Sequence, residues 1–322
     1  LEFRRVLFRS EWIFGKPYAH FYIDDLSINS YADLEKELGF YKTDTKERKF
    51  NKLEKGQLNV RIKNGPKNVI EGEIFWYKNI PDNIKQLFPL FIKNSHDLKS
   101  YTMETIYGID IKYQYLHEAF SQEQLIKYLD TIEMIHNETE HITQNINDND
   151  IYLNYVEKIK KRYESYNYTK FNKSEEIYNK LIKYFIDYEL NKEGHISIIH
   201  GDPVFSNCII DKHKNFKFID MRGKLGDKMT IFGDKWYDYG KIYQSLKGYD
   251  EILENTIVSN EYKDNLVNTF ENYIINKFSK ETLYKINMIT NSLLFTLIPL
   301  HDNKKCIKYY NLIKMWIYNI SY

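Results

Sequence analysis

The chain has 322 residues, with 46 lysines and arginines against 45 aspartates and glutamates, so its net charge is only +1. This balance argues against a nucleic-acid or membrane-surface partner, and the longest apolar run, residues 292–300, is too short to span a bilayer. Two cysteines, Cys208 and Cys306, argue against a disulfide framework and for a reducing compartment, so we expect a cytoplasmic protein. The length indicates one large or two modest domains.

Residues 1–10 do not look like natural protein sequence. Their sequence, LEFRRVLFRS, resembles the in-frame translation of a sequencing adapter. We therefore exclude them from the fold prediction and expect the natural sequence to begin near Glu11.

Residues 11–43 contain two short polar motifs. Lys16 lies in a Gly-Lys-Pro loop, and Asp24 and Asp25 follow the apolar residues 21–23. This pattern resembles the C-terminal part of a haloacid dehalogenase-like phosphatase, which implies that Lys16 serves phosphate and that Asp24 and Asp25 serve Mg²⁺. A strand that ends in a solvated acidic turn would explain the same residues. No D-x-D motif of that family precedes Lys16, so we expect a remnant without phosphatase activity.

Residues 44–108 are predicted to form a small β-rich lobe. A charged linker over residues 43–55 leads into a turn and strand at residues 56–63. Residues 69–77 have the apolar spacing of an amphipathic helix that ends before Pro81. Two further strands are predicted at residues 88–92 and 100–106.

Residues 109–322 are predicted to be mainly helical. His136, at the end of a predicted helix, is more simply explained as a capping or core histidine than as a ligand. A Gly-punctuated loop is expected over residues 222–233, before a helix that opens at Asp234. Apolar residues recur at three- and four-residue spacing in residues 122–136, 151–166, 174–190, 262–278, 282–298 and 304–317.

The most informative stretch follows the apolar residues 198–199. His200 and Asp202 open a Pro-containing loop, Asn207 comes five positions after Asp202, and Asp220 ends the next pair of predicted strands. Phosphoryl transfer needs one carboxylate to accept a proton, and an amide plus a second carboxylate to hold Mg²⁺. A hairpin whose Asp and Asn satisfy turn backbone groups would explain the loop, but not a third acid at a strand end.

The pattern His-Gly-Asp-x-x-x-x-Asn followed by Ile-Asp resembles the aminoglycoside phosphotransferase and choline kinase superfamily, small-molecule kinases with a protein-kinase-like fold. The resemblance implies an α+β fold of two lobes, a small β-rich lobe over residues 44–108 and a larger helical lobe over residues 109–322. It also implies ATP or GTP as phosphate donor, Mg²⁺ as cofactor, and a hydroxyl of an amino-alcohol, sugar or aminoglycoside as acceptor.

The same resemblance implies roles for individual residues. Asp202 would be the catalytic base, and Asn207 and Asp220 would hold Mg²⁺. His200 and Asp238 would support the catalytic loop, although an Asp near a helix start also favours the helix dipole. The residues implied for the nucleotide are Lys63 on a strand, Glu73 on a helix, and Met103 and Glu104 at the hinge between the lobes. A sheet strand followed by a turn would also explain residues 103–108.

The Lys–Glu pair has alternatives in the neighbouring sequence. Arg61, Lys67 and Glu71 lie close enough to take the roles of Lys63 and Glu73. In a lysine-rich chain such pairs are often solvated.

A single glycine, Gly56, stands where many kinases have a glycine-rich phosphate loop. The alternative function is therefore a catalytically weak binding or scaffold protein of kinase fold. The full set of Asp202, Asn207 and Asp220 favours an enzyme, and the absence of an Ala-Pro-Glu segment after Asp220 disfavours a protein kinase. A kinase joined to a phosphatase remnant suggests bacterial capsule or surface-glycan metabolism. The sequence leaves the oligomeric state open.

Overall fold

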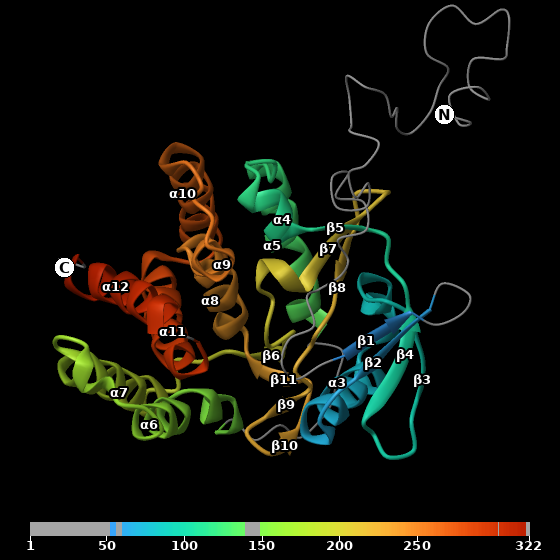
Figure 1. The fold of residues 1–322 in the computed structure, drawn as a ribbon, viewed down its shortest axis with the longest axis horizontal. Coiled ribbons are helices and arrows are strands. Elements are labelled where there is room, and N and C mark those ends of the chain that lie inside the picture. Colours follow the sequence, from blue (N-terminus) through green and yellow to red (C-terminus); the bar gives the residue numbers. More distant parts are fainter. Residues whose placement is uncertain (1–51, 56–59, 139–148, 302, 320–322) are drawn as a thin grey trace, which may run out of the picture. The chain divides into compact units, whose positions relative to one another are not determined.

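The computed structural model describes residues 52–55, 60–138, 149–301 and 303–319 (Figure 1). Lys16, Asp24 and Asp25, with the rest of the predicted phosphatase remnant, lie outside these residues, and so does Gly56. The expectations for them remain predictions.

A four-stranded antiparallel sheet forms the first part of the described chain. Its strand order is β1 (Lys52–Lys55), β2 (Val60–Asn64), β4 (Ser100–Glu104) and β3 (Phe91–Asn94). The linker predicted over residues 43–55 is wrong at its end, because residues 52–55 pair with residues 61–64. The strand predicted at residues 88–92 begins only at Phe91, since Pro89 has no N–H to donate to a neighbouring strand.

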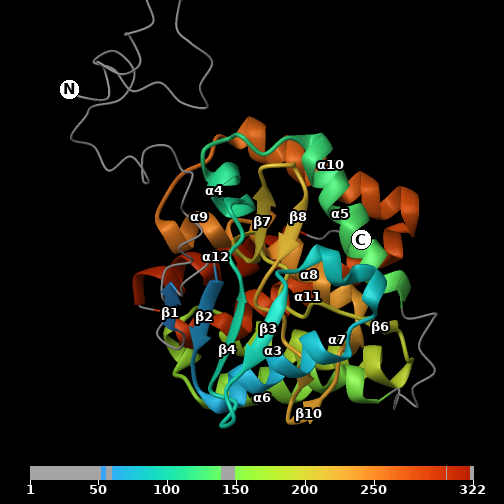
Figure 2. The same cartoon turned by 90° about the vertical axis from the view of Figure 1, so that its right-hand side faces the viewer.

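The helix predicted over residues 69–77 is confirmed as α3 (Lys67–Asn79), which ends before Pro81. It contacts β4 and lies beside the sheet in Figure 2. The ring centroid of Tyr77 on α3 is 5.7 Å from that of Tyr101 and 5.3 Å from that of Phe91. These aromatic contacts fix the helix against the sheet, and the short 3-10 helix η1 (Asp82–Leu87) leads from α3 toward β3.

The chain leaves this sheet after β4. Residues 105–107 lead into β5 (Gly108–Asp110), which pairs with β7 (Cys208–Asp211), and β7 pairs in turn with β8 (Phe216–Phe218). Figure 1 shows β5 reaching from the first sheet toward the helices. This one short crossing separates a β-rich part of the described chain from a helical part.

The part of the described chain after β5 is mainly helical. α8 (Lys235–Leu246) packs against α11 (Lys280–Leu297), which also contacts α12 (Asn303–Asn319). The other helices are α4 (Ile111–Leu116), α5 (Gln122–Asn137), α6 (Val156–Glu164), α7 (Ser174–Leu190), α9 (Tyr249–Glu254) and α10 (Asn260–Lys277), and the short 3-10 helices include η4 (Tyr168–Lys170) and η6 (Ile298–Leu300).

Two predictions for this part are wrong in detail. The helix predicted over residues 151–166 starts only at Val156, because the 3-10 helix η3 (Asp150–Asn154) precedes it. The loop predicted over residues 222–233 contains a hairpin of β9 (Lys224–Leu225) and β10 (Lys228–Met229), and then β11 (Phe232–Asp234), which pairs with β6 (Ile196–Ile198). Strands of two or three residues are too short to leave a periodic signal in the sequence.

Several carboxylates in the helical part accept hydrogen bonds from tyrosine hydroxyls. Asp234 accepts hydrogen bonds from Tyr155 and Tyr188, each at 2.6 Å. Burial and the nearby Asp234 charge raise the pKa of Tyr155 well above its ordinary value, so it remains a donor. The same pairing joins Tyr115 to Glu251, Tyr239 to Glu133 and Tyr243 to Glu271.

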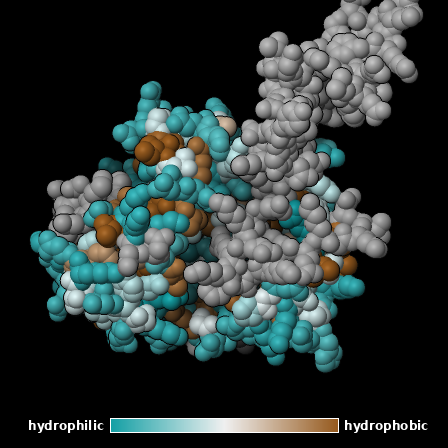
Figure 3. Space-filling model, in the orientation of Figure 1, coloured by the Kyte–Doolittle hydropathy of each residue, from teal (hydrophilic) through white to brown (hydrophobic). Residues whose placement is uncertain are grey.

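The face of the molecule in Figure 3 is mainly hydrophilic, with apolar residues in separate groups. Scattered apolar groups of this kind need no binding partner to explain them. None of the helices within the described ranges is long and apolar enough to cross a bilayer.

Candidate active site

Lys63 on β2, Glu73 on α3 and Asp220 after β8 form a buried ion cluster. The Nζ of Lys63 lies 2.8 and 2.7 Å from the two carboxylate oxygens of Glu73 and 2.7 Å from Oδ1 of Asp220. Lys63 is 1% exposed and Glu73 4% exposed, and Tyr101 donates to Glu73 at 2.7 Å. Although burial alone would lower it, the charges of Asp220 and Glu73 hold the pKa of Lys63 above its ordinary value. The ammonium group is therefore charged and fixed.

The structure distinguishes this pair from its neighbours in the sequence. Lys67 is exposed at the start of α3 and Glu71 is half-buried. Arg61 is buried two residues before Lys63, on the same face of β2, so it lies on the side of the strand that faces the cluster. Of the candidates, Lys63 and Glu73 are the two that pair with each other.

Two glycines allow α3 to approach the segment after Asp220. A Cβ at Gly72 would lie 2.5 Å from the carbonyl oxygen of Arg222. Gly223 has a φ of +61°, and a Cβ there would lie 1.8 Å from the carbonyl oxygen of Gly72. One turn further along α3, Trp76 Nε1 donates to the carbonyl oxygen of Ile199 at 2.9 Å. The helix that carries Glu73 is thus held against both segments that carry the other candidate residues.

Asp202 lies in the loop between β6 and β7 with a cation on each carboxylate oxygen. Nη2 of Arg222 lies 2.9 Å from Oδ2, and Nζ of Lys241 lies 3.0 Å from Oδ1. The side chains of Asp202 and Lys241 are 10% and 11% exposed, whereas that of Arg222 is 56% exposed. The backbone N–H of Arg222 also donates to the carbonyl oxygen of His200 at 3.0 Å. This bond ties the Asp202 loop to the segment after Asp220.

His200 is fully buried at the start of the same loop. Its Nδ1 accepts from the backbone N–H of Asp202 at 3.2 Å, and its ring packs edge-on against Phe218. Burial lowers the pKa of His200, so the ring is a neutral part of the loop's framework.

Asn207 ends the loop, in the 3-10 helix η5 (Phe205–Asn207), and is fully buried. Its Nδ2 donates to the carbonyl oxygen of Asp202 at 2.9 Å, and Ser206 Oγ lies 3.3 Å from its amide oxygen. The N–H of Ile219 donates to the carbonyl oxygen of Asn207 at 3.0 Å, which places Asn207 beside the residue that precedes Asp220. Because the nitrogen end of the amide is engaged by Asp202, a cation would meet the oxygen end.

This donor set fits Mg²⁺ better than a transition metal. The Asn207 amide and the Asp220 carboxylate are hard oxygen ligands of the kind that Mg²⁺ takes together with phosphate oxygens. Within the described part of the chain, no group of three or more His, Cys, Asp or Glu side chains could hold a metal ion. A Mg²⁺ site of one carboxylate and one amide would therefore need further oxygen ligands, such as those of a bound phosphate.

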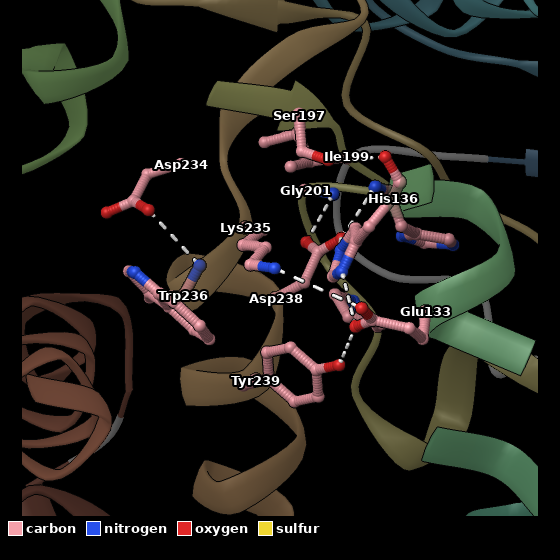
Figure 4. A network of polar contacts seen from close by, with 12 residues as sticks. Glu133, His136, Ser197, Ile199, Gly201, Asp234, Lys235, Trp236, Asp238 and Tyr239 are labelled. Atoms are coloured by element: carbon pink, nitrogen blue, oxygen red, sulfur yellow. Dashed lines mark hydrogen bonds and ion pairs between the residues drawn. The ribbon is translucent and has the colours of Figure 1, made fainter. Parts of the chain in front are cut away.

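Asp238, in the first turn of α8, holds the beginning of the loop (Figure 4). Its Oδ2 accepts from the backbone N–H of His200 and its Oδ1 from that of Gly201, both at 2.8 Å. His136 Nε2 lies 3.2 Å from the same Oδ2. Favourable interaction with the helix dipole does not explain these bonds, since they engage both carboxylate oxygens with residues outside α8.

His136 connects Asp238 to Glu133, a second buried carboxylate (Figure 4). Its Nδ1 lies 3.9 Å from Glu133 Oε2, and Tyr239 donates to the same group. Although burial alone would lower it, the interactions with Asp238 and Glu133 raise the pKa of His136. Burial also opposes ionisation of Glu133, yet its interaction with His136 and its hydrogen bond from Tyr239 lower its pKa to about 2. His136 is thus buried in the core between two carboxylates, which agrees with its interpretation as a core histidine.

Met103 and Glu104 end β4, directly before the crossing to β5. Met103 is buried, and its sulfur lies 3.9 Å from the hydroxyl of Tyr77. The carboxylate of Glu104 accepts from the N–H of Leu90 at 3.1 Å, and the N–H of Glu104 donates to the Leu90 carbonyl at 2.9 Å. The predicted hinge residues therefore lie at the crossing, where Glu104 also closes the end of the sheet.

Arg222 and Lys241, the cations on Asp202, were not predicted from the sequence. Each leaves a weak signal: Arg222 follows two residues after Asp220, and Lys241 follows Asp238 by three residues, on the same face of α8. Neither spacing identifies Asp202 as the partner, because the contact forms only when the loop folds over the helix.

No protein-family model matches the chain, and the comparison with curated proteins gives no match. Solved structures do match. A choline kinase from Streptococcus pneumoniae has a TM-score of 0.56 at 13% identity, covering 83% of this chain and 89% of that one. A choline/ethanolamine kinase family protein from Mesorhizobium loti has a TM-score of 0.57 at 9% identity, covering 84% and 86%. A glucosamine kinase in complex with glucosamine, ADP and inorganic phosphate has a TM-score of 0.54 at 8% identity, covering 84% and 76%.

At these identities the likeness shows the fold. The chain has the α+β, two-lobed architecture of the small-molecule kinases, and the fold prediction made from the His-Gly-Asp motif is confirmed.

Proposed function

We propose that this chain is a small-molecule kinase that transfers the γ-phosphoryl group of ATP or GTP to a hydroxyl group. The observation that carries the proposal is the buried ion cluster of Lys63, Glu73 and Asp220 beside the loop that presents Asp202 and Asn207, within a kinase-like fold. Phosphoryl transfer needs groups that position phosphates and a group that removes a proton. The ion cluster would position the phosphates, and the loop would supply the proton acceptor.

The nucleotide would bind on the side of Lys63. Because Glu73 holds the charged ammonium in a buried site, its position is set before the phosphates arrive. Asp220 and Asn207 would hold Mg²⁺, which would supply positive charge against the negative charge that develops during transfer. Met103 and Glu104 would lie along the purine base of the nucleotide, at the crossing between the lobes.

The acceptor would bind on the side of Asp202. Its carboxylate takes the proton of the attacking hydroxyl as the bond between the acceptor oxygen and phosphorus forms. The bond between phosphorus and the bridging oxygen of the nucleoside diphosphate breaks, and the diphosphate leaves. The bonds from Asp238 to the N–H groups of His200 and Gly201 keep the loop in one conformation, so that Asp202 needs no reorganisation.

The acceptor belongs to the range of amino-alcohols, sugars and aminoglycosides. Choline and glucosamine are the acceptors named for two of the similar structures. The resemblance of residues 11–43 to a phosphatase remnant supports a role in cytoplasmic steps of bacterial capsule or surface-glycan metabolism.

Two substitutions test the division of labour. Asp202→Asn removes the proton acceptor, so turnover should fall roughly 100-fold or more while nucleotide affinity stays close to that of the parent. Asp220→Asn removes a metal-bound charge, so it should weaken Mg²⁺-dependent nucleotide binding as well as turnover, with partial rescue by excess Mg²⁺ or by Mn²⁺. Asp187→Asn, at an exposed position on α7, is the matched control.

The measurements are calorimetric titrations with ATP and GTP, with and without Mg²⁺, and a phosphorylation screen over amino-alcohols and sugars. Parent-like turnover in Asp202→Asn, or parent-like binding of Mg²⁺-nucleotide in Asp220→Asn, would refute the roles assigned to these residues. If the screen found no phosphorylated acceptor, a catalytically weak binding or scaffold protein of the same fold would replace the kinase.

A further inference from the structure

The surroundings of Asp202 contain more positive charge than one carboxylate balances. We propose that the acceptor carries an oxyanion, a carboxylate or a phosphate, which binds Arg222, Lys241 and Lys158 while the acceptor hydroxyl meets Asp202. The inference rests on the proposed kinase function and specifies the class of its acceptor.

Three cations from three different segments lie around Tyr237 and Asp202. Lys158 on α6 donates to the Tyr237 hydroxyl at 2.9 Å, and its Nζ lies 5.4 Å from the centroid of that ring. The Nζ of Lys241 on α8 lies 5.9 Å from the same centroid and 3.0 Å from Asp202. Arg222, after β8, reaches the other oxygen of Asp202 at 2.9 Å. Among residues 60–138 and 149–301, no carboxylate forms an ion pair with Lys158.

The most exposed of these cations can still bind an oxyanion. A guanidinium has five N–H donors in a planar fork that matches carboxylate and phosphate oxygens. The contact with Asp202 is made by Nη2, and the Arg222 side chain is 56% exposed. The remaining edge of the fork, with the half-buried Lys158 ammonium, would form a site for two or three oxygens next to the proposed base.

The electrostatics of Lys158 favour an anion at this position. Burial and the Arg222 charge lower the pKa of Lys158 to about 7, and Arg162 acts in the same direction. The groups that face it are the Tyr237 hydroxyl, these two guanidinium groups and Asp202, which acts in the opposite direction. A bound anion would offset the cost of the ammonium charge, so binding near neutral pH would take up a proton and would strengthen as the pH falls from 8 to 6.

The cations lie on the acceptor side of the site. The charges that act most on Lys158 are those of Arg222 and Asp202, whereas the charges on Lys63 come from Asp220 and Glu73. A cationic acceptor such as choline or glucosamine would be repelled next to Asp202. This arrangement favours sugars over amino-alcohols and aminoglycosides, and it extends the range to polyols, where the sugar or polyol bears a carboxylate or a phosphate.

The test compares two series of compounds that differ in charge on one carbon skeleton. The first series is glucose, glucuronate, glucose 6-phosphate and glucosamine, and the second is glycerol, glycerate, glycerol 3-phosphate and 2-amino-1,3-propanediol. Binding is measured by calorimetry in the presence of Mg²⁺-ADP, in buffers of different ionisation enthalpy that report proton uptake, and transfer is measured with Mg²⁺-ATP. The carboxylate and phosphate arms show which oxyanion the site takes.

The variants are Arg222→Gln and Lys158→Met, with Lys160→Met, at an exposed position of α6, as control. In the parent and the control, an anionic member of at least one series should bind roughly tenfold or more tighter than the neutral member, and the amine should bind weakest. Both test variants should remove this preference, and proton uptake should disappear in Lys158→Met. Affinity for Mg²⁺-ADP should stay unchanged in all of them.

Tightest binding of an amine, or of a neutral compound in both series, would overturn the inference. A loss of affinity for Mg²⁺-ATP alone in the two variants would also overturn it, because the cations would then bind the γ-phosphate and not the acceptor. Asp202-dependent phosphorylation of an amine would refute the anionic acceptor and leave the kinase intact. Anion-selective binding without Asp202-dependent transfer would instead refute the kinase.

Discussion

Gly223→Ala should separate α3 from the segment after Asp220. The new Cβ would lie 1.8 Å from the carbonyl oxygen of Gly72, and Cβ contacts below 3.0 Å are essentially never seen, so one of the two segments must move by about 1 Å. The φ of +61° at Gly223 adds backbone strain of about 1–2 kcal/mol for any residue with a side chain.

Gly226→Ala is a matched control for the strain alone. Gly226 has a φ of +56°, but a Cβ there would meet its nearest neighbour, Cδ1 of Leu153, at an ordinary 3.8 Å. We expect a loss of about 1 kcal/mol in the free energy of unfolding for Gly226→Ala and about 3 kcal/mol or more for Gly223→Ala. In a protein of this size, each kcal/mol lowers Tm by roughly 2 °C.

The two variants should differ more in function than in stability. Movement of α3 would stretch the contacts of 2.8 and 2.7 Å between Lys63 and Glu73, and a misplacement of about 1 Å can reduce turnover roughly 100-fold. Thermal unfolding measures the effect on stability, and titration with Mg²⁺-ATP together with the rate of phosphoryl transfer measures the effect on function. Equal Tm values and equal nucleotide affinities for Gly223→Ala and Gly226→Ala would refute the idea that Gly223 sets the approach of α3.

Two further substitutions test the supports of the site. Because the pKa of Glu133 is lowered from its ordinary 4.5 to about 2, its ionised form should contribute roughly 3 kcal/mol to stability above pH 4.5, a contribution that is lost as the pH falls toward 2. In urea unfolding, the difference in free energy of unfolding between the parent and Glu133→Gln should therefore become smaller from pH 7 to pH 3. A difference that does not change with pH would contradict the lowered pKa of Glu133. Trp76→Phe should retain the packing of α3 but leave the carbonyl oxygen of Ile199 without its donor, at a cost of about 1–2 kcal/mol in urea unfolding; parent-like stability would show that this bond does not hold α3 in place.

Long helices could be predicted from the sequence because each one carries its own signal. The helix predicted over residues 174–190 has the bounds of α7, since seventeen residues give several repeats of the apolar spacing. The hairpin of β9 and β10 has two residues in each strand and depends on partners for its formation, so the sequence suggested only a loop. The late start of α6 could not be predicted either. The apolar spacing continues back to residue 151, but residues 150–154 form a 3-10 helix.

The residues of the candidate site also differ in whether the sequence could predict them. Asp202, Asn207 and Asp220 lie within nineteen positions of one another, and their order alone indicated a shared site. Lys158 comes from a helix 44 positions before Asp202, and nothing in the sequence near it distinguishes it from the exposed Lys160 and Lys161. Contacts of this kind arise from packing of the helices, so the grouping of Lys158 with Arg222 and Asp202 could be read only from the structure.

The bonds between tyrosines and carboxylates give the protein an optical signal of its own unfolding. Burial raises the pKa of Tyr155 and Tyr239 well above the ordinary value of 10.0, which the unfolded chain would restore. Since these groups are held neutral in the fold, the stability they confer is present below pH 10 and is lost as the pH rises above it. Tyrosinate absorbs at a longer wavelength than tyrosine. In alkaline solution the part of the absorbance that comes from these buried rings should therefore rise together with the loss of helical circular dichroism, because the buried rings ionise only as the helices that cover them come apart.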